Sequence, residues 1–310
     1  MPKIHQRIES VIGLDVAQKT VTLHDSQTDL TITIDNTLDA LLMALLPLRD
    51  RVLAICEATG GHEDPLLATL ISLGIPVHRG DGAKISAFAR SLGRAKTDRL
   101  DARMLALYGA ERGETLSRYV PEHENHARLV ALVRRRIDMV EARKIERTRA
   151  KAPRAGLMKD SFARAIAFLD SEIDCIDQAI KTLFGADTNL AARKAILETI
   201  PGIAAITAAN LVALMPELGR ITRRRAASLA ALAPHPKDSG TTNLRRKTTG
   251  GRRALRPILF IAALSASRGD NKLATFYKKL VQIGKPKRLA LVAVMRKMIV
   301  IANARLAQAY

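Results

Sequence analysis

Two apolar runs near the N-terminus constrain the fold most, because each resembles a buried strand and each carries an acid. Asp15 interrupts the run at 11–17, and Glu57 ends the run at 52–57. Short apolar runs of this length are typical of strands inside a sheet. A carboxylate is costly in such a strand unless its charge is compensated. The pattern therefore indicates a sheet that holds acids for a purpose other than packing.

A second pair of acids lies in the sequence KTDRLDA at 96–102, which is typical of a helix start. Asp98 and Asp101 are three residues apart and share one helix face. Two strand acids and two helix acids can converge, and crowded carboxylates raise one another's pKa. Mg²⁺ or Mn²⁺ removes that repulsion, and two such ions roughly 4 Å apart clamp a phosphoryl displacement. In the alternative interpretation, Asp98 caps the helix and Asp101 is a solvated first-turn acid.

The order of predicted elements around these acids indicates an α/β fold. Three short strands come first, and helices then alternate with further strands. This is the order of the ribonuclease-H-like fold, which hosts two-metal nucleases and transposases and places the first acid on strand one and the second on strand four. The predicted strands are 11–17, 20–24, 30–34, 52–57 and one after the turn at 74–78, and the predicted helices are 38–48, 64–73, 83–91 and 98–112.

Length and composition favour a globular protein of two or three domains. The chain has 310 residues, of which 47% are apolar. No apolar run approaches 18 residues, so no membrane partner is expected, and the N-terminus does not resemble a signal peptide. Cys56 and Cys175 form no Cys-x-x-Cys, which argues against a zinc ribbon or a disulfide scaffold. We expect a protein of the bacterial cytoplasm, associated with the nucleoid.

The charge distribution predicts a polyanion partner. Net charge is +20. Residues 1–125 carry a net −3, residues 126–156 a net +7 and residues 220–310 a net +19. The acid-bearing region is thus nearly neutral, while two later regions are suited to phosphates. A ribosomal or membrane-surface protein would also be basic, and the four acids argue against both.

Residues 126–183 are predicted to form two long helices. The second has apolar residues at alternating steps of four and three from Phe162 to Leu183, as in a heptad seam. An antiparallel coiled coil, within one chain or between chains, and an ordinary amphipathic helix pair both fit. The first helix carries the arginines that we expect to bind a structured RNA: Arg134, Arg135, Arg143 and Arg147. Aromatic residues make up only 3%, so such an RNA would be held by its phosphates and shape rather than by stacking.

Further along, the sequence IPGI at 200–203 lies between two predicted helices, 191–199 and 204–214. A tight Pro-Gly turn there resembles a helix-hairpin-helix motif, in which backbone amides bind a phosphate without reading bases. Pro201 and Gly202 are therefore candidate DNA contacts. A plain turn between helices is the alternative.

The most basic stretch, residues 220–256, holds eleven Lys or Arg and one acid. We predict a loop at 233–242 that presents Ser239 as a nucleophile, ringed by cations that would bind the scissile phosphate. In the alternative interpretation, Ser239 and the following glycine simply form a turn. The candidate cations are Lys237, Arg245, Arg246, Arg252 and Arg253. Three packing helices are predicted beyond, at 255–267, 273–283 and 289–307.

Taken together, five motifs resemble a known family. They are IGLDVA at 12–17, EATG at 57–60, KTDRLDA at 96–102, IPGI at 200–203 and APHPKDSG at 233–240. Over about residues 11–264, the chain is similar to the DEDD transposases of the insertion-sequence "one-ten" family, related to the Piv-type DNA invertases. One departure is the Arg252-Arg253 pair after Gly250-Gly251, where a small polar residue is expected.

The resemblance implies a RuvC-like domain at 1–120, coiled-coil helices at 121–189 and a C-terminal transposase domain at 190–310. It implies that Asp15, Glu57, Asp98 and Asp101 bind Mg²⁺ and that Ser239 forms a phosphoserine link to DNA. It also implies a noncoding bridge RNA that pairs with donor and target DNA.

We therefore expect an RNA-guided recombinase that works as a dimer or tetramer. The rival hypotheses are a RuvC-like metal-dependent junction nuclease, which uses water instead of serine, and a non-catalytic nucleic-acid scaffold.

Overall fold

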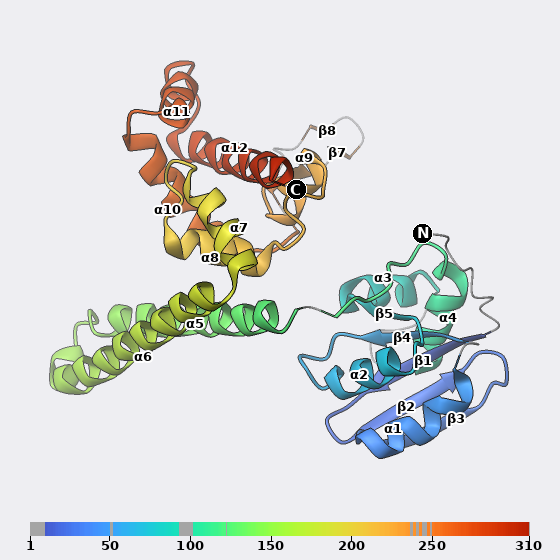
Figure 1. Cartoon of the computed structure of the whole chain (residues 1–310). Coiled ribbons are helices and arrows are strands. Elements are labelled where there is room, and N and C mark those ends of the chain that lie inside the picture. Colours follow the sequence, from blue (N-terminus) through green and yellow to red (C-terminus); the bar gives the residue numbers. More distant parts are fainter. Residues whose placement is uncertain are drawn as a thin grey trace. The chain divides into compact units, whose positions relative to one another are not determined.

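The computed structural model describes residues 10–49, 52–92, 102–121, 123–235, 238–239, 242–243, 247–248 and 250–309. The chain forms two compact units, Met1–Pro121 and Glu122–Tyr310. Figure 1 shows a sheet with its covering helices in the first unit, and an assembly of helices in the second. The finer division into three domains, with a boundary at 189, stays a prediction.

A five-stranded mixed sheet forms the centre of the first unit. The strand order is β3-β2-β1-β4-β5. β1 pairs antiparallel with β2 and parallel with β4, which suits its nearly continuous apolar sequence because both of its faces are covered. This arrangement confirms the α/β class and fits a ribonuclease-H-like order. The strands are β1 (Ser10–Val16), β2 (Thr20–Asp25), β3 (Thr31–Asp35), β4 (Val52–Glu57) and β5 (Val77–Gly80).

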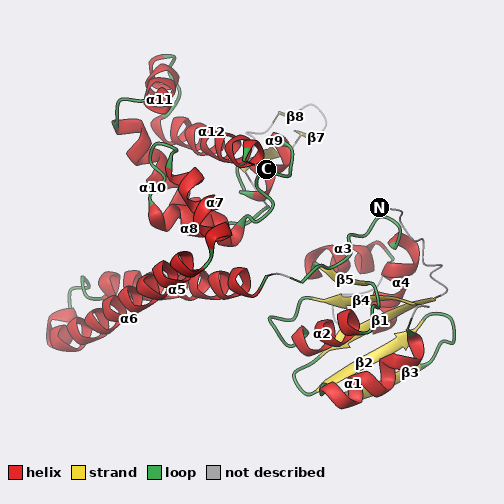
Figure 2. Ribbon diagram, viewed as in Figure 1, coloured by secondary structure: helices red, strands yellow, loops and turns green. Residues whose placement is uncertain are grey.

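Helices cover both faces of this sheet (Figure 2). On one face, α1 (Leu38–Leu45), η1 (Leu46–Leu48) and α2 (Asp64–Ser72) pack on strand residues such as Ile12 and Leu14. On the other, α3 (Gly82–Ser91) and α4 (Ala102–Arg112) pack on Val11, Leu53 and Ile55. Because strand side chains alternate between faces, Asp15 and Glu57 point to the side that α3 and α4 cover.

Gly13 lets α4 lie directly on β1. A Cβ at this position would be 1.8 Å from the carbonyl oxygen of Ala102 and 2.5 Å from the amide nitrogen of Ala106. Any side chain at Gly13 would therefore push the helix away from the strand. Gly109, further along α4, also packs closely, because a Cβ there would be 2.5 Å from side-chain carbons of Val11 and Ile55. The first turn of α4 therefore packs on β1 at Gly13, two residues before Asp15 in the sequence.

The second unit consists mostly of helices. A 26-residue and a 28-residue helix come first, and shorter helices then pack around α12. The helices are α5 (Glu124–Arg149), η2 (Ala155–Met158), α6 (Lys159–Ala186), α7 (Thr188–Glu198), α8 (Ala205–Leu214), α9 (Arg223–Leu229), α10 (Leu255–Arg268), α11 (Lys272–Gln282) and α12 (Lys287–Gln308).

α5 and α6 pack along each other within the chain (Figure 1). The predicted seam is buried in its C-terminal half, where Ile173, Ile176 and Ile180 join a core with residues of α5 such as Leu129 and Val133. The apolar seam is thus used inside one chain. Whether the pair has coiled-coil geometry stays a prediction.

The predicted loop at 233–242 is in part a set of short strands, which corrects that expectation. Asp238–Ser239 pairs antiparallel with Thr242–Asn243, and Pro234–His235 pairs with Lys247–Thr248. The strands are β6 (Pro234–His235), β7 (Asp238–Ser239), β8 (Thr242–Asn243) and β9 (Lys247–Thr248). Pairing gives the backbone groups partners, an advantage that the Pro- and Gly-rich sequence does not reveal.

Candidate active site

Asp15 and Glu57 lie on neighbouring parallel strands, near the ends of both. β1 and β4 pair up to Leu14 and Cys56, and the two acids are the next residues of each strand. Both side chains are half-buried and project toward the same face of the sheet. The structure thus brings together the two strand acids that the sequence predicted.

The electrostatics of Glu57 reflect this crowding. Burial raises the pKa of Glu57 most, and the negative charges of Asp15 and Asp81 raise it further. Asp81 is the N-cap of α3, where its carboxylate accepts a hydrogen bond of 2.9 Å from the amide of Ala83. Sequence reasoning missed Asp81, although an acid directly before a helix start is a recognisable cap signal. Three acids therefore contribute to one negative region.

The carboxylate of Glu57 also lies against the first residue of α3. A Cβ on Gly82 would be 1.9 Å from Glu57 Oε1 and 2.9 Å from its Cδ. Gly82 thus leaves the space that the carboxylate uses. Among the described residues, no three His, Cys, Asp or Glu side chains come close enough to hold a metal ion by themselves.

The predicted helix acids, Asp98 and Asp101, lie outside the described residues. α4 begins at Ala102, directly after Asp101 in the sequence. Ala102 packs on Gly13, on the strand that carries Asp15.

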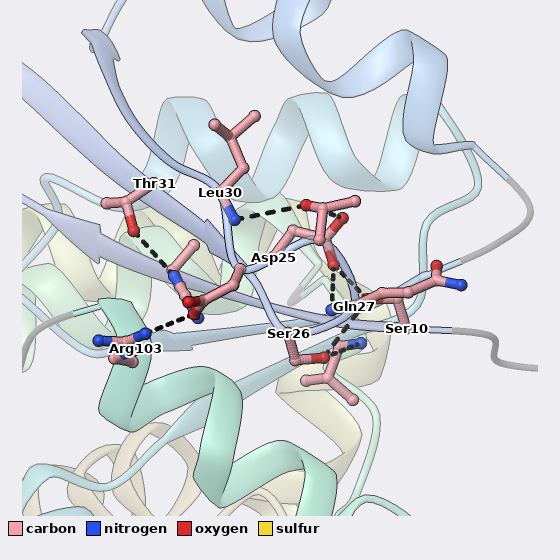
Figure 3. Close-up of polar contacts among 11 residues, drawn as sticks. Ser10, Asp25, Ser26, Gln27, Leu30, Thr31 and Arg103 are labelled. Carbon is pink, nitrogen blue, oxygen red and sulfur yellow. Dashed lines mark hydrogen bonds and ion pairs between the residues drawn. The ribbon is translucent and has the colours of Figure 1, made fainter.

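A polar cluster ties the first turn of α4 to the turn between β2 and β3 (Figure 3). Arg103 donates to the carboxylate of Asp29, a residue with a positive φ of 56°. The buried His24 has Nδ1 2.8 Å from the hydroxyl of Thr31 and Nε2 3.7 Å from Asp29. An exposed ion pair such as Arg103–Asp29 contributes about 0–1 kcal/mol, so its main effect is orientation.

Asp25, in the same cluster, is a buried carboxylate, whereas Asp29 is exposed. It is buried beside the start of β1, where Ser10, the amide of Gln27 and the hydroxyl of Thr28 donate to it. Burial raises the pKa of Asp25, but these hydrogen bonds outweigh burial and hold the pKa below its usual value. Its charge is therefore satisfied within the fold.

In the second unit, Ser239 lies on β7, where it pairs with Thr242 across the two-stranded ladder. Its side chain lies outside the described part of the structure, as do the three predicted cations Lys237, Arg245 and Arg246.

The predicted DNA-binding hairpin packs against another helix. Gly202 has a φ of 85°, and a Cβ there would be 2.2 Å from the carbonyl oxygen of Ala262 on α10. The glycine is therefore required by this close approach as well as by the turn. Pro201 is exposed at the tip. A phosphate contact at this hairpin stays a prediction.

Several predicted phosphate-binding arginines have acidic partners within the fold. Arg143 and Arg147 on α5 bind Asp170 on α6. Arg252 forms a two-bond ion pair with Glu217, at 2.7 and 2.6 Å. Burial raises the pKa of Glu217, but the hydrogen bond and charge of Arg252, together with a backbone hydrogen bond and the charge of Arg225, outweigh burial and lower it. These three arginines therefore stabilise the helical unit.

Other predicted arginines face solvent. Arg134, Arg135 and Arg253 are exposed. Arg134 and Arg253 line a cavity of about 480 Å³ together with Asp138. These exposed arginines can meet a polyanion without first breaking an ion pair with Asp170 or Glu217.

Comparison with known proteins decides the family. A model of the transposase IS116/IS110/IS902 family matches residues 194–278, and a DEDD transposase model of the IS110 type matches residues 12–155. Pilin gene-inverting proteins of Moraxella lacunata and Moraxella bovis are each 32% identical over 259 residues, which cover 82% of this chain and 80% of each relative. The chain belongs to the IS116/IS110/IS902 transposase family.

The transposase is thus a DNA-recombining enzyme, as its sequence predicted. Its DEDD family model implies the use of a divalent metal in general. A protein of insertion element IS116 from Streptomyces clavuligerus is also 32% identical, over 46% of this chain and 37% of that protein. Among the described residues of the transposase, no helix is long and apolar enough to cross a membrane.

Proposed function

We propose that this transposase cuts and exchanges strands of donor and target DNA through an acid site and a serine intermediate, guided by a noncoding RNA. The acid site consists of Asp15, Glu57, Asp98 and Asp101. One observation carries this proposal. Asp15 and Glu57 face the side of the sheet on which α4 begins, and α4 follows Asp98 and Asp101 directly in the sequence.

The donor set at this site fits Mg²⁺ or Mn²⁺, because carboxylate oxygens are the ligands that these ions prefer. Asp15, Glu57, Asp98 and Asp101 would hold the metal. When bound, it would stabilise charge on the scissile phosphate. Asp81 adds negative potential from the start of α3, and Gly82 leaves room for the carboxylate of Glu57.

Ser239 supplies the covalent step in this proposal. Its Oγ loses its proton and attacks the phosphorus, the bond from phosphorus to the leaving deoxyribose oxygen breaks, and that oxygen takes up a proton. A deoxyribose hydroxyl of the partner strand then attacks the phosphoserine and releases the serine. The number of phosphodiester bonds is unchanged, so no external energy source is needed. Because two duplexes must be cut together, we propose a dimer or tetramer.

The names of two relatives favour exchange over hydrolysis. The Moraxella proteins are named for inverting a pilin gene, and inversion requires that cut ends be rejoined. A junction nuclease that uses water would leave them open. A covalent protein–DNA product therefore separates the two functions.

The test is adduct formation on DNA substrate with the bound RNA present. Wild type should give a DNA-linked protein band after denaturation, and Ser239→Ala should bind DNA and give none. Ser228→Ala, on α9 of the same unit, serves as the matched control and should give the wild-type band. An adduct in Ser239→Ala would refute the assignment, and cleavage without an adduct in wild type would favour the nuclease.

A further inference from the structure

The loop that follows Glu57 is folded around a buried carboxylate. Glu63 is fully buried although it stands at the start of α2. Its Oε2 accepts the amide of Thr59 at 3.1 Å, the hydroxyl of Thr59 at 2.7 Å and the amide of Gly61 at 2.8 Å. Gly60 and Gly61 have φ angles of 85° and 116°, which bend the chain back toward this carboxylate.

The other oxygen of Glu63 joins this loop to the neighbouring strand. Arg79 on β5 donates its Nη2 to Glu63 Oε1. Arg79 is the register partner of Cys56, the residue directly before Glu57. Glu63 therefore joins the loop after Glu57 to Arg79, which pairs with the residue before Glu57. The predicted metal ligand lies between these two attachment points.

Asn36 supports the same loop from outside. Its Nδ2 donates to the carbonyl oxygen of His62 at 2.9 Å and to that of Ala17 at 3.2 Å. Ala17 lies two residues after Asp15, and His62 lies in the loop after Glu57. One amide group thus joins the segments that follow the two strand acids.

We propose that Glu63 and Asn36 are positioning residues that set the Glu57 carboxylate relative to Asp15 for metal binding. This inference rests on the proposed role of Glu57 as a metal ligand. Glu63 holds the loop of Glu57 against β5, and Asn36 holds it against the end of β1. Neither residue contacts the metal itself.

A purely structural role would have a different signature. Replacing a residue that only stabilises the fold lowers the free energy of unfolding but leaves metal affinity unchanged in the folded molecules. Replacing a positioning residue weakens metal binding even when the fold is intact, because outer-shell partners orient the ligands. The two roles are therefore separated by measuring metal affinity and unfolding on the same variants.

The experiment measures Mn²⁺ binding to the whole 310-residue chain without DNA, by the electron paramagnetic resonance of the free Mn²⁺. We expect Glu63→Gln and Asn36→Ala each to weaken Mn²⁺ binding about tenfold, the low end of the range for outer-shell changes. Circular dichroism and urea unfolding show whether each variant is folded. If Glu63→Gln does not fold, Asn36→Ala decides, because Asn36 is only half-buried and its loss should be tolerated.

Asp25→Asn is the matched control. It alters another buried, hydrogen-bonded carboxylate of the same sheet, beside the start of β1 rather than its end. We expect it to lower stability and to leave Mn²⁺ affinity unchanged. If Asp25→Asn weakened Mn²⁺ binding as much as the test variants, general loosening of the unit would replace positioning as the explanation.

Glu57→Gln separates the two levels of the proposal. It should abolish Mn²⁺ binding if Glu57 is a ligand. If Glu57→Gln loses binding while folded Glu63→Gln and Asn36→Ala bind as wild type, the positioning role is wrong and the metal site stands. If Glu57→Gln binds Mn²⁺ as wild type, the metal site itself is wrong.

Discussion

The two units of this transposase treat charge in opposite ways. In the first, Glu57 lies where burial and the charges of Asp15 and Asp81 raise its pKa. In the second, many cations face solvent, such as Arg134 and Arg135, and residues 220–310 carry a net +19. Each unit also contains charges that the fold satisfies, such as Glu63 in the first and Arg252 in the second.

The difference separates structural charge from functional charge. Glu63 and Asp25 have pKa values that hydrogen bonds lower, so their ionised forms stabilise the fold. The raised pKa of Glu57 shows that its ionised form is disfavoured without an added cation. The exposed arginines are the positive counterpart, suited to a polyanion. Substitution of these acids and arginines tests whether this separation holds.

The largest effect is expected on strand cleavage. Asp15→Asn, Glu57→Gln, Asp98→Asn and Asp101→Asn should each lower the cleavage rate by on the order of a thousandfold, as removal of a group that stabilises transition-state charge does. Cleavage of labelled DNA measures this, with and without EDTA. Asp25→Asn should keep most of the activity. Full activity in Asp98→Asn, or in EDTA, would contradict the acid site.

A smaller effect concerns the stability that Glu63 provides. Burial raises the pKa of Glu63, but hydrogen bonds from Thr59 and Gly61 outweigh burial and lower it to about 2. A lowered pKa stabilises the fold above the unfolded value near 4.5, and this contribution is lost as pH falls toward 2. Glu63→Gln should therefore cost about 3 kcal/mol at pH 7. Urea unfolding should show the difference from wild type shrinking as pH falls below 4.5.

Substitutions of two other acids should change the free energy of unfolding in opposite directions. The pKa of Glu57 is raised, so its ionisation destabilises the fold as pH rises through the folded pKa. Glu57→Gln should therefore raise the free energy of unfolding at pH 7, by about 0.5–2 kcal/mol. Asp25→Asn should lower it by about 1–3 kcal/mol, because the amide offers one acceptor oxygen in place of two and the charge that strengthens these hydrogen bonds is lost. Urea denaturation of both variants measures this. If both substitutions changed the free energy of unfolding in the same direction, the distinction between the two acids would be wrong.

The smallest effect is expected for nucleic acid. Neutralising Arg134 and Arg135 together should reduce the slope of log affinity against log salt by about 1–2 for the RNA of the element, with a smaller change for plain duplex DNA. Filter binding at several salt concentrations measures both. Neutralising Arg143 and Arg147 is the comparison, and it should mainly loosen the α5–α6 pair. Equal loss for RNA and DNA would indicate a general phosphate surface.

Much of the fold could be predicted because local patterns agreed with tertiary structure. The strand 52–57 and the seam from Ile173 to Leu183 were predicted from apolar periodicity and are found as expected. The strands at 234–248 were not predicted, because two-residue pairs carry almost no periodic signal. The close packing of α4 on Gly13 also depends on contacts between distant segments.

The candidate site could be predicted only in part. Asp15 and Glu57 stood out because acids are unusual in apolar strands, and the structure places them side by side. Glu63 did not stand out, because an acid before a helix resembles a solvated first-turn residue. Its burial depends on a loop that bends back and on Arg79 from another strand. The roles of Asp98, Asp101 and Ser239 stay predictions.

The two cysteines have consequences for chemical labelling. Cys56 is fully buried, and burial, followed by the charge of Glu63, raises its pKa to about 12. Cys175 is exposed on α6. A maleimide should therefore modify the native protein at Cys175 and spare Cys56, since the thiolate is the reactive form. The natural chain thus accepts a single fluorophore on its helical pair without any engineered residue. The slower rate at which Cys56 is alkylated would then report how often the sheet opens transiently beside Glu57.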